Sequence, residues 1–307
     1  MLAKRAEILF YYDARMSNPN GDPDENRPRI DRVTKKNYVT EFRLKRTIRD
    51  YIYNVLDKKI FMRKELVSKE KNDVKTIEQL AFKYIDPDKK KINRASLFND
   101  HIDIKLFGLL FAVGDIHFNQ TGPVQFSIGQ SLNNPEEMPI RMTRVVPTRE
   151  EAQGGGFGEK YIVRYSFIGF HGFINNFVAK ETNLSEEDII IMLKAMWRGT
   201  TILSTSSKYG QQSRLLFKVN YKDQGYIGDL DLKPKLETNA DPLENITQLI
   251  LNLQNLFDTF SDNSDIIESI EYEYSPELLC YFNGIEKPLD DIIKESKIQN
   301  LFSKLDL

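Results

Sequence analysis

Residues 18–29 read Asn-Pro-Asn-Gly-Asp-Pro-Asp-Glu-Asn-Arg-Pro-Arg and follow an apolar, aromatic run at residues 6–12. The apolar run predicts a buried strand. Asn, Gly and Pro at this density predict a rigid, non-repetitive loop, whose side-chain amides and backbone N–H groups suit phosphate oxygens and base edges. Behind the loop, residues 27–64 carry 13 Lys or Arg against 4 Asp or Glu. The stretch therefore predicts a strand, a donor-rich loop and a basic helix in succession.

Two interpretations of the loop stay open: a purely structural turn, or a contact with nucleic acid through Asn18, Asn20, Arg27 and Arg29. An EF-hand calcium loop is excluded by spacing, because it needs glycine at its sixth position and Gly21 is the fourth residue here.

Composition narrows the class of protein. Hydrophobic residues make up 40% of the 307 and charged residues 29%, which allows a packed core in one large domain or two modest ones. The single cysteine, Cys280, excludes an internal disulfide and a cysteine zinc cluster, as is typical of a reducing cytoplasm. No apolar run approaches the roughly 18 residues of a membrane span. We therefore expect a cytoplasmic protein without a membrane segment. Residues 255–307 are acidic, with 12 Asp or Glu against 4 Lys or Arg.

The basic helix is predicted to begin at an N-cap, Thr40, and to end near residue 56. A period of 3.6 residues places four apolar side chains on one face and three cations on the other. The apolar set is Leu44, Ile48, Tyr51 and Val55, and the cationic set is Lys45, Arg46 and Arg49. The cations suit a phosphodiester backbone, although an ordinary solvated helix face is the alternative.

The order of the remaining patterns is compatible with an α+β fold of the ferredoxin or RNA-recognition type. Strands are predicted at residues 124–132, 161–174 and 215–221, and a helix from the cap Ser185 to about Gly199. Further predictions are a charged peripheral insertion at 57–100, a protruding arm or hairpin at 133–158 that carries Arg141 and Arg144, and a helix at 243–260.

Catalytic motifs are not found. The segment 154–160 lacks the Gly-Lys-Ser/Thr order of a phosphate loop, and the three histidines lack metal-binding spacing. His171, near a strand end, is interpreted as a core or turn histidine rather than a general base. The loop 206–214 offers donors that suit RNA, although an ordinary helix-to-strand loop explains it equally well. These donors are Lys208, Gln211, Ser213 and Arg214.

Several motifs, in order over residues 6–221, resemble one known family. They are Ser17-Asn-Pro-Asn-Gly-Asp-Pro23, Asn26-Arg-Pro-Arg-Ile-Asp31, Leu44-Lys-Arg-Thr-Ile-Arg-Asp-Tyr51, Leu106-Phe-Gly108, Gly122-Pro-Val-Gln-Phe-Ser127, Ile140-Arg-Met-Thr-Arg144, His171-Gly-Phe-Ile174, Trp197-Arg-Gly-Thr200 and Ser206-Ser-Lys-Tyr-Gly-Gln-Gln-Ser-Arg-Leu-Leu216. They are similar to the backbone subunits of type I Cascade complexes, the Cas7 family of the RAMP superfamily, and most similar to its subtype I-B (Csh) branch.

The resemblance implies a hand-shaped fold, with a modified RNA-recognition (ferredoxin-like) palm, a finger insertion and a thumb hairpin. It places the palm at 1–56 and 101–242, the thumb at about 133–158, the finger at 57–100 and a helical C-terminal extension at 243–307. It also implies a scaffold that binds CRISPR RNA, stacks head to tail as a filament with other Cascade subunits, and presents the guide to target DNA.

In that role the chain needs no catalytic residue, metal or cofactor, and it contacts RNA without reading its sequence. The candidate RNA-binding residues are Asn18, Asn20, Arg27, Arg29, Lys45, Arg46, Arg49, Gln125, Ser127, Arg141, Arg144, His171, Lys208, Gln211, Ser213 and Arg214.

Two rival functions stay open. Related subunits of type III complexes cleave target RNA with an acidic residue in the loop after the first strand, and the candidates here are Asp13, Asp22, Asp24 and Asp31. The other rival is a monomeric module that binds single-stranded RNA without forming a filament.

Overall fold

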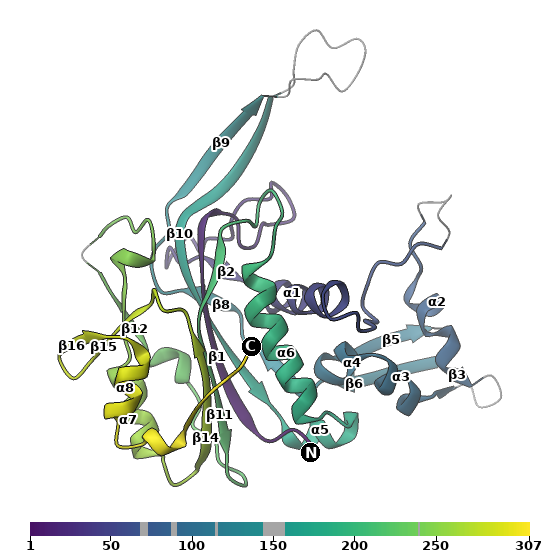
Figure 1. The fold of residues 1–307 in the computed structure, drawn as a ribbon. Helices are drawn as coiled ribbons and strands as arrows, with labels where there is room; N and C mark the ends of the chain where they lie inside the picture. The colour runs from purple at the N-terminus through teal and green to yellow at the C-terminus, as the bar shows by residue number, and fades with distance from the viewer. Residues whose placement is uncertain (68–72, 87–90, 114–115, 144–156, 239) are drawn as a thin grey trace.

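The computed structural model of the chain describes residues 1–67, 73–86, 91–113, 116–143, 157–238 and 240–307. At its centre lies a sheet whose main path is β17-β14-β11-β1-β10-β8-β2 (Figure 1). These strands are β1 (Ala6–Ser17), β2 (Tyr38–Val39), β8 (Gly129–Ser131), β10 (Phe157–Ile174), β11 (Gln211–Tyr221), β14 (Ile267–Tyr274) and β17 (Phe302–Lys304). Two more strands, β7 (Val124–Phe126) and β9 (Glu137–Thr143), pair with β10.

The central strand, β1, lies between β10 and β11 and is antiparallel to both. Its side chains are buried on both faces of the sheet from Ala6 to Ala14, which explains why the apolar run is nearly continuous rather than alternating. The strand predicted at residues 6–12 is confirmed. It extends five residues further, because the ladder with β10 continues to the pair Ser17 and Val163.

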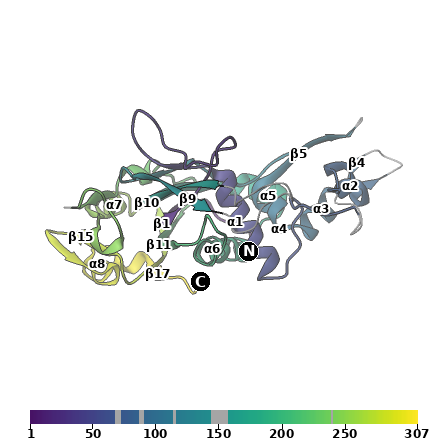
Figure 2. The same ribbon diagram turned by 90° about the horizontal axis from the view of Figure 1, so that it is seen from above.

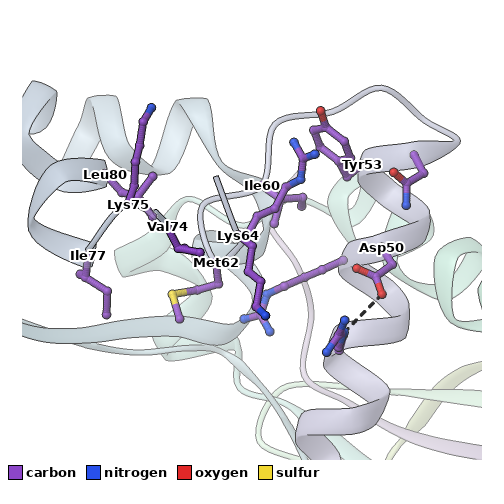
Figure 3. Close-up of a pocket in the computed structure, with 13 residues that line it drawn as sticks. Asp50, Tyr53, Ile60, Met62, Lys64, Val74, Lys75, Ile77 and Leu80 are labelled. Carbon is purple, nitrogen blue, oxygen red and sulfur yellow. Dashed lines mark ion pairs between the residues drawn. The ribbon is translucent and has the colours of Figure 1, made fainter. Parts of the chain in front are cut away.

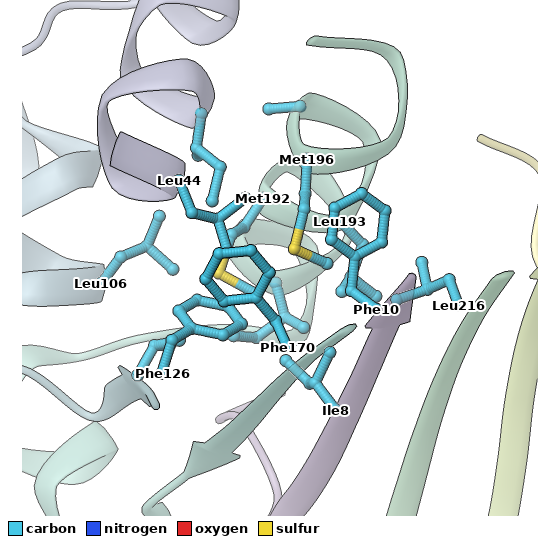
Figure 4. Close-up of a cluster of buried hydrophobic side chains, with 14 of the residues drawn as sticks. Ile8, Phe10, Leu44, Leu106, Phe126, Phe170, Met192, Leu193, Met196 and Leu216 are labelled. Atoms are coloured by element: carbon cyan, nitrogen blue, oxygen red, sulfur yellow. The ribbon is translucent and has the colours of Figure 1, made fainter. Parts of the chain in front are cut away.

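Helices α1 (Glu41–Asn54) and α6 (Glu186–Thr201) cover one face of the sheet. Figure 4 shows Leu44 of α1 and Met192 and Met196 of α6 above Phe10 and Phe170 of the strands. Both predicted caps are confirmed, since the Thr40 hydroxyl accepts from the Arg43 N–H and the Ser185 hydroxyl accepts from the Asp188 N–H. A short helix, α5 (Asn176–Thr182), precedes α6.

The C-terminal unit packs on the other face of the sheet. It contains a small sheet and two helices: β12 (Lys235–Glu237), β13 (Ile250–Asn252), β15 (Leu279–Phe282), β16 (Ile285–Lys287), α7 (Gln254–Asp262) and α8 (Leu289–Glu295). The described residues also form four short 3-10 turns: η1 (Phe82–Tyr84), η2 (Leu230–Leu232), η3 (Ile246–Gln248) and η4 (Gln299–Leu301).

The expectation of one helix over residues 243–260, within a helical extension, is wrong. Leu249, Leu251 and Leu253 are buried at a period of two, and the middle residue of the three lies in β13. Helical spacing begins only with α7. Apolar residues spaced two and four positions apart in this segment also fit a helix, which is why the sequence favoured one. The structure instead forms β13 there, hydrogen-bonded between β12 and β15.

The insertion after α1 has a core of its own, unlike the charged, weakly patterned segment that the sequence suggested. Its elements are α2 (Ile77–Ala81), β3 (Ile85–Asp86), β4 (Lys91–Ile92), α3 (Arg94–Asp100), α4 (Ile102–Phe107), β5 (Gly108–Val113) and β6 (Ile116–Thr121). Phe61 and Phe98 pack with Phe111 and Phe118, and four of the nine buried residues in this cluster lie beyond residue 100. Figures 1 and 2 both show the insertion at one end of the molecule and the C-terminal unit at the other.

A two-stranded arm made of β9 and the first residues of β10 projects from the sheet (Figure 1). The register runs from the pair Val163 and Glu137 to the pair Phe157 and Thr143. The arm is a hairpin, but its return strand extends to residue 163, five residues beyond the predicted end at 158. Residues 144–156, and with them Arg144, lie outside the described residues.

Candidate nucleic-acid interface

The Asn-rich loop is fixed by the two asparagines that the sequence analysis singled out. The Asn18 amide donates to the carbonyls of Asn26 at 2.7 Å and Tyr161 at 3.3 Å. The Asn20 Oδ1 accepts from both the N–H and the hydroxyl of Thr40, the residue that caps α1. These two side chains therefore tie the loop to the arm and to the start of the basic helix.

A second loop, residues 202–210 between α6 and β11, meets the end of β1. The Asn18 N–H donates to the Ser207 carbonyl at 2.7 Å, and the Arg15 N–H donates to the Gly210 carbonyl at 2.9 Å. Gly210 has a φ of +98°, and a Cβ there would lie 2.5 Å from the Arg15 carbonyl oxygen. Only glycine permits this close approach, which brings the loop against the strand.

This junction gathers cations from three elements. Lys208 comes from the second loop, Arg43 from the first turn of α1 and Lys160 from β10. The ammonium groups of Lys208 and Lys160 donate to the carbonyls of Asn18 and Ser206, respectively, and the Arg43 guanidinium donates to the Thr47 hydroxyl. Within the described ranges, none of the three forms an ion pair with a carboxylate. Arg15 of β1, whose N–H group binds the second loop, is exposed.

The pKa of Lys208 reflects both the burial of its ammonium group and the nearby positive charges. Burial and the positive charges of Arg43 and Lys160 lower that pKa to about 8. Burial and the charge of Arg46 lower the pKa of the Arg43 guanidinium. An anion placed here would relieve the repulsion between cations.

Two buried polar atoms near the junction also have no hydrogen-bond partner in the described part of the chain: Asn18 Oδ1 and Gln211 Nε2. Buried polar groups are almost always satisfied in folded proteins. The junction therefore combines unsatisfied polar atoms with the positive charge that attracts phosphates.

Comparison with known proteins identifies the family. A family model described as CRISPR-associated protein Cas7 matches residues 4–254. The chain belongs to the Cas7 family. A CRISPR-associated protein Cas7 from Haloferax volcanii is 30% identical over 303 residues, which cover 87% of this chain and 85% of that protein.

Solved structures described as CRISPR RNA-guided surveillance complexes contain chains with a similar fold. A chain of one described as pre-nicking has a TM-score of 0.53 at 13% identity and covers 91% of this chain and 96% of its own length. A second has the same TM-score and identity and covers 88% of both chains. The Cas7 assignment and the α/β architecture thus agree.

The predicted cationic face of α1 is wrong in its geometry. Lys45 is buried, with its ammonium 3.2 Å from Gln125 Oε1 and over the ring of Phe107, because residue 45 faces β7 and α4 rather than solvent. Arg49 is paired at 3.0 Å with the fully buried Asp103, which also caps the backbone of Phe61 and Met62. Only Arg46 is exposed, and its pair with Asp50 at 3.6 Å is loose.

Three other predicted residues line a separate, open pocket of about 470 Å³ near the start of β1. Gln125, Ser127 and His171 lie there with Arg5, Phe173 and Tyr226. The His171 Nε2 is 2.7 Å from Oε1 of the fully buried Glu7. Burial alone would lower the pKa of His171, but the hydrogen bond and charge of Glu7 raise it. His171 thus lines this pocket of the Cas7 chain and also links β10 to β1 through its contact with Glu7.

The remaining predicted residues are mostly engaged within the protein. Arg27 pairs with Glu137 at 2.7 Å and stacks over Tyr161, and Arg29 donates to the Gly21 carbonyl. Ser213 donates to the Trp197 carbonyl. Arg214 pairs with the buried Asp13 at 2.8 Å. Arg141 is exposed on the arm, 3.5 Å from Glu159.

Sequence analysis missed Arg43, Lys160 and Arg15. Lys160 and Arg15 are isolated along the chain, so no local cluster marks them. Arg43 had two usable signals: it lies three residues after the Thr40 cap and two residues before Lys45 in the basic helix.

Proposed function

We propose that this Cas7 chain is the backbone subunit of a type I CRISPR surveillance (Cascade) complex, and that it binds CRISPR RNA through the ribose-phosphate backbone. One observation supports this most strongly: among the described residues, Arg43, Lys160 and Lys208 converge without a carboxylate partner, and burial together with the charges of Arg43 and Lys160 lowers the pKa of Lys208. Such a site attracts phosphates whatever the bases attached to them. Guide spacers vary in sequence, so a subunit that holds them requires this indifference.

The proposed hand has the sheet as its palm. The strands β11, β1, β10 and β7 lie in the order 4-1-3-2 of a βαββαβ unit, with α1 and α6 on one face. The arm at 133–158 would be the thumb and the insertion after α1 the finger. The finger would extend past the predicted boundary at residue 100, because its core includes Phe111 and Phe118.

Copies of the subunit would stack head to tail along the guide, together with other subunits of the complex in the cytoplasm, and present the guide to target DNA. A heterologous contact of this kind gives an open filament rather than a closed ring. The arm supports the proposal, because its described strands, residues 137–143 and 157–163, project from the sheet, as a contact with a neighbouring copy would require (Figure 1).

A scaffold role is favoured over RNA cleavage because three of the four candidate acidic residues are engaged within the protein, while the fourth, Asp24, is exposed. Asp13 accepts from Tyr165 and Arg214. The Asp22 carboxylate accepts the N–H groups of two following residues, and the Asp31 carboxylate accepts those of Val33 and Thr34. The carboxylates of Asp22 and Asp31 thus stabilise turns, and that of Asp13 forms an ion pair with Arg214.

Light scattering of the purified protein with guide RNAs of increasing length tests the function. We expect the number of bound copies to rise with RNA length, and complementary RNA to stay intact in the presence of divalent metal. One copy per guide at every length would support the monomeric module. Cuts that disappear on an Asp→Ala change in the loop would support the ribonuclease.

The affinity for guide RNA is expected to depend on pH through Lys208. Its pKa is about 8 in the free protein, against 10.5 ordinarily, and a bound phosphate would raise it. Binding is therefore unaffected up to about pH 7.5 and falls as pH rises above 8, by up to about tenfold per unit. Fluorescence anisotropy from pH 6.5 to 9 measures this dependence. Lys208→Arg should flatten the curve, and an unchanged slope in that variant would contradict the assignment.

A further inference from the structure

A pocket of about 520 Å³ lies between α1 and the insertion that follows it. It is separate from the Lys208 junction and from the pocket of His171. Figure 3 shows Asp50 and Tyr53 of α1 on one wall, Met62 and Ile77 on the other, and Lys64 between them.

The floor and the rim of this pocket differ in chemistry. The apolar side is unusually open to solvent, with Met62 42%, Val74 47% and Ile77 37% exposed. Among the described residues, the rim carries five cations and one carboxylate, that of Asp50. Arg49 and Lys75 are already paired with carboxylates, and Asp50 is only loosely paired with Arg46. Lys64 and Arg63 form no ion pair within the described ranges, which leaves the rim with an excess of positive charge.

Arg63 also provides a flat surface. Its guanidinium lies 3.4 Å from the centroid of the Tyr53 ring, which leaves its other face available for a second planar group. Aromatic rings and guanidinium planes are the usual stacking partners of nucleic-acid bases in single strands.

The pocket and the cation junction lie along the same helix, α1. Arg43 belongs to the junction, and Arg46 and Arg49 follow on the same helix at intervals of one turn, about 9 Å in total along the axis. The charge of Arg46 is close enough to lower the pKa of Arg43. A strand held at the junction would therefore meet the exposed guanidinium of Arg46 before it reaches the pocket.

From this juxtaposition we infer that the pocket between α1 and the insertion binds one nucleotide of a single strand, with its base on the Met62–Ile77 floor beside Arg63 and its phosphate on Arg46 and Lys64. The inference rests on the proposed RNA-binding function and adds a contact with the base. The contact is apolar and stacking, and so is tolerant of base identity.

The test compares two labelled probes with the full-length protein: an oligouridine short enough to bind one copy, and an abasic ribose-phosphate oligomer of equal length. We expect the wild type to prefer the base-bearing probe by about 5- to 100-fold, as base stacking implies. Ile77→Glu should abolish that preference. Leu110→Glu, which puts the same charge on a 72% exposed residue of the same unit away from the pocket, should retain it.

Each outcome has a distinct meaning. Equal binding of both probes by the wild type, or an unchanged preference in Ile77→Glu, would overturn the inference and leave the backbone-binding function standing. Failure of both probes to bind would instead contradict the proposed function. If Ile77→Glu keeps the preference but lowers the number of copies on a long guide, the pocket binds a neighbouring copy and the inference is wrong.

Discussion

Replacing Arg43, Lys160 and Lys208 together by alanine is expected to weaken binding of unrelated guide RNAs by about a hundredfold or more. Each charged contact with a phosphate contributes on the order of 1.5–3 kcal/mol, and the three residues share one junction without a competing carboxylate in the described part of the chain. The slope of log affinity against log salt should fall by about 2, since each contact with single-stranded RNA accounts for about 0.7. Anisotropy titrations at several salt concentrations measure both quantities.

The control removes the same charge elsewhere. Lys233, Lys235 and Lys297 belong to the C-terminal side of the molecule, and their triple alanine variant should keep both the affinity and the salt slope. A general loss of positive charge would weaken both variants alike. Equal slopes in the two variants would show that the junction does not touch the backbone of the guide.

The fold was predictable where a local pattern had one structural solution. The run at residues 6–12 is apolar at every position because β1 is covered on both faces, and Thr40 and Ser185 are caps whose partners lie three residues away. Signals of this kind are complete within one segment. The loop after β1 was equally clear, because Asn18 and Asn20 hold it by contacts with nearby backbone.

The fold was not predictable where pairing with a distant strand decided whether a segment forms a helix or a strand. The leucines before α7 fit a helix in sequence, but β13 exists because β12 and β15 flank it. The same applies to the insertion, whose core joins Phe61 and Phe98 to residues of β5 and β6. Neither part of the insertion has a hydrophobic pattern clear enough to predict that it packs against the other part.

In the candidate site, too, local features were predictable from the sequence and contacts between distant segments were not. Sequence reasoning placed Lys208 in a loop between a helix and a strand, and the structure has that loop between α6 and β11. Its role in RNA binding stays a prediction. Sequence reasoning misplaced Lys45, because a helical wheel gives the face of a side chain but not which neighbours cover that face. Gln125 and Phe107 approach Lys45 from β7 and from the end of α4. The junction that carries the proposed function consists of single residues from distant segments, and only the folded chain brings them together.

Glu7→Ala is expected to lower the free energy of unfolding by about 3–5 kcal/mol. Glu7 is fully buried, and its carboxylate accepts from the Tyr221 hydroxyl, the Gly228 N–H at 3.1 Å and His171 Nε2. Removing one partner of a buried charged network leaves the other groups desolvated and unsatisfied. Urea denaturation at pH 6 measures the loss, and Glu286→Ala, at an exposed residue, should cost little.

The pH dependence of unfolding separates this network from simple packing. Burial alone would raise the pKa of Glu7, but the hydrogen bonds and charge of its partners hold it below 4.5, so its stabilisation is lost as pH falls through the folded-state value. The raised pKa of His171 works in the opposite sense: its stabilisation is complete below 6.5 and is lost as pH rises through the folded-state value. The pair therefore contributes most between about pH 4.5 and 6.5. In Glu7→Ala the loss of stability toward alkaline pH should become smaller than in the wild type. If both proteins lost stability in parallel above pH 6.5, His171 would not owe its charge to Glu7, and the network would be a packing feature only.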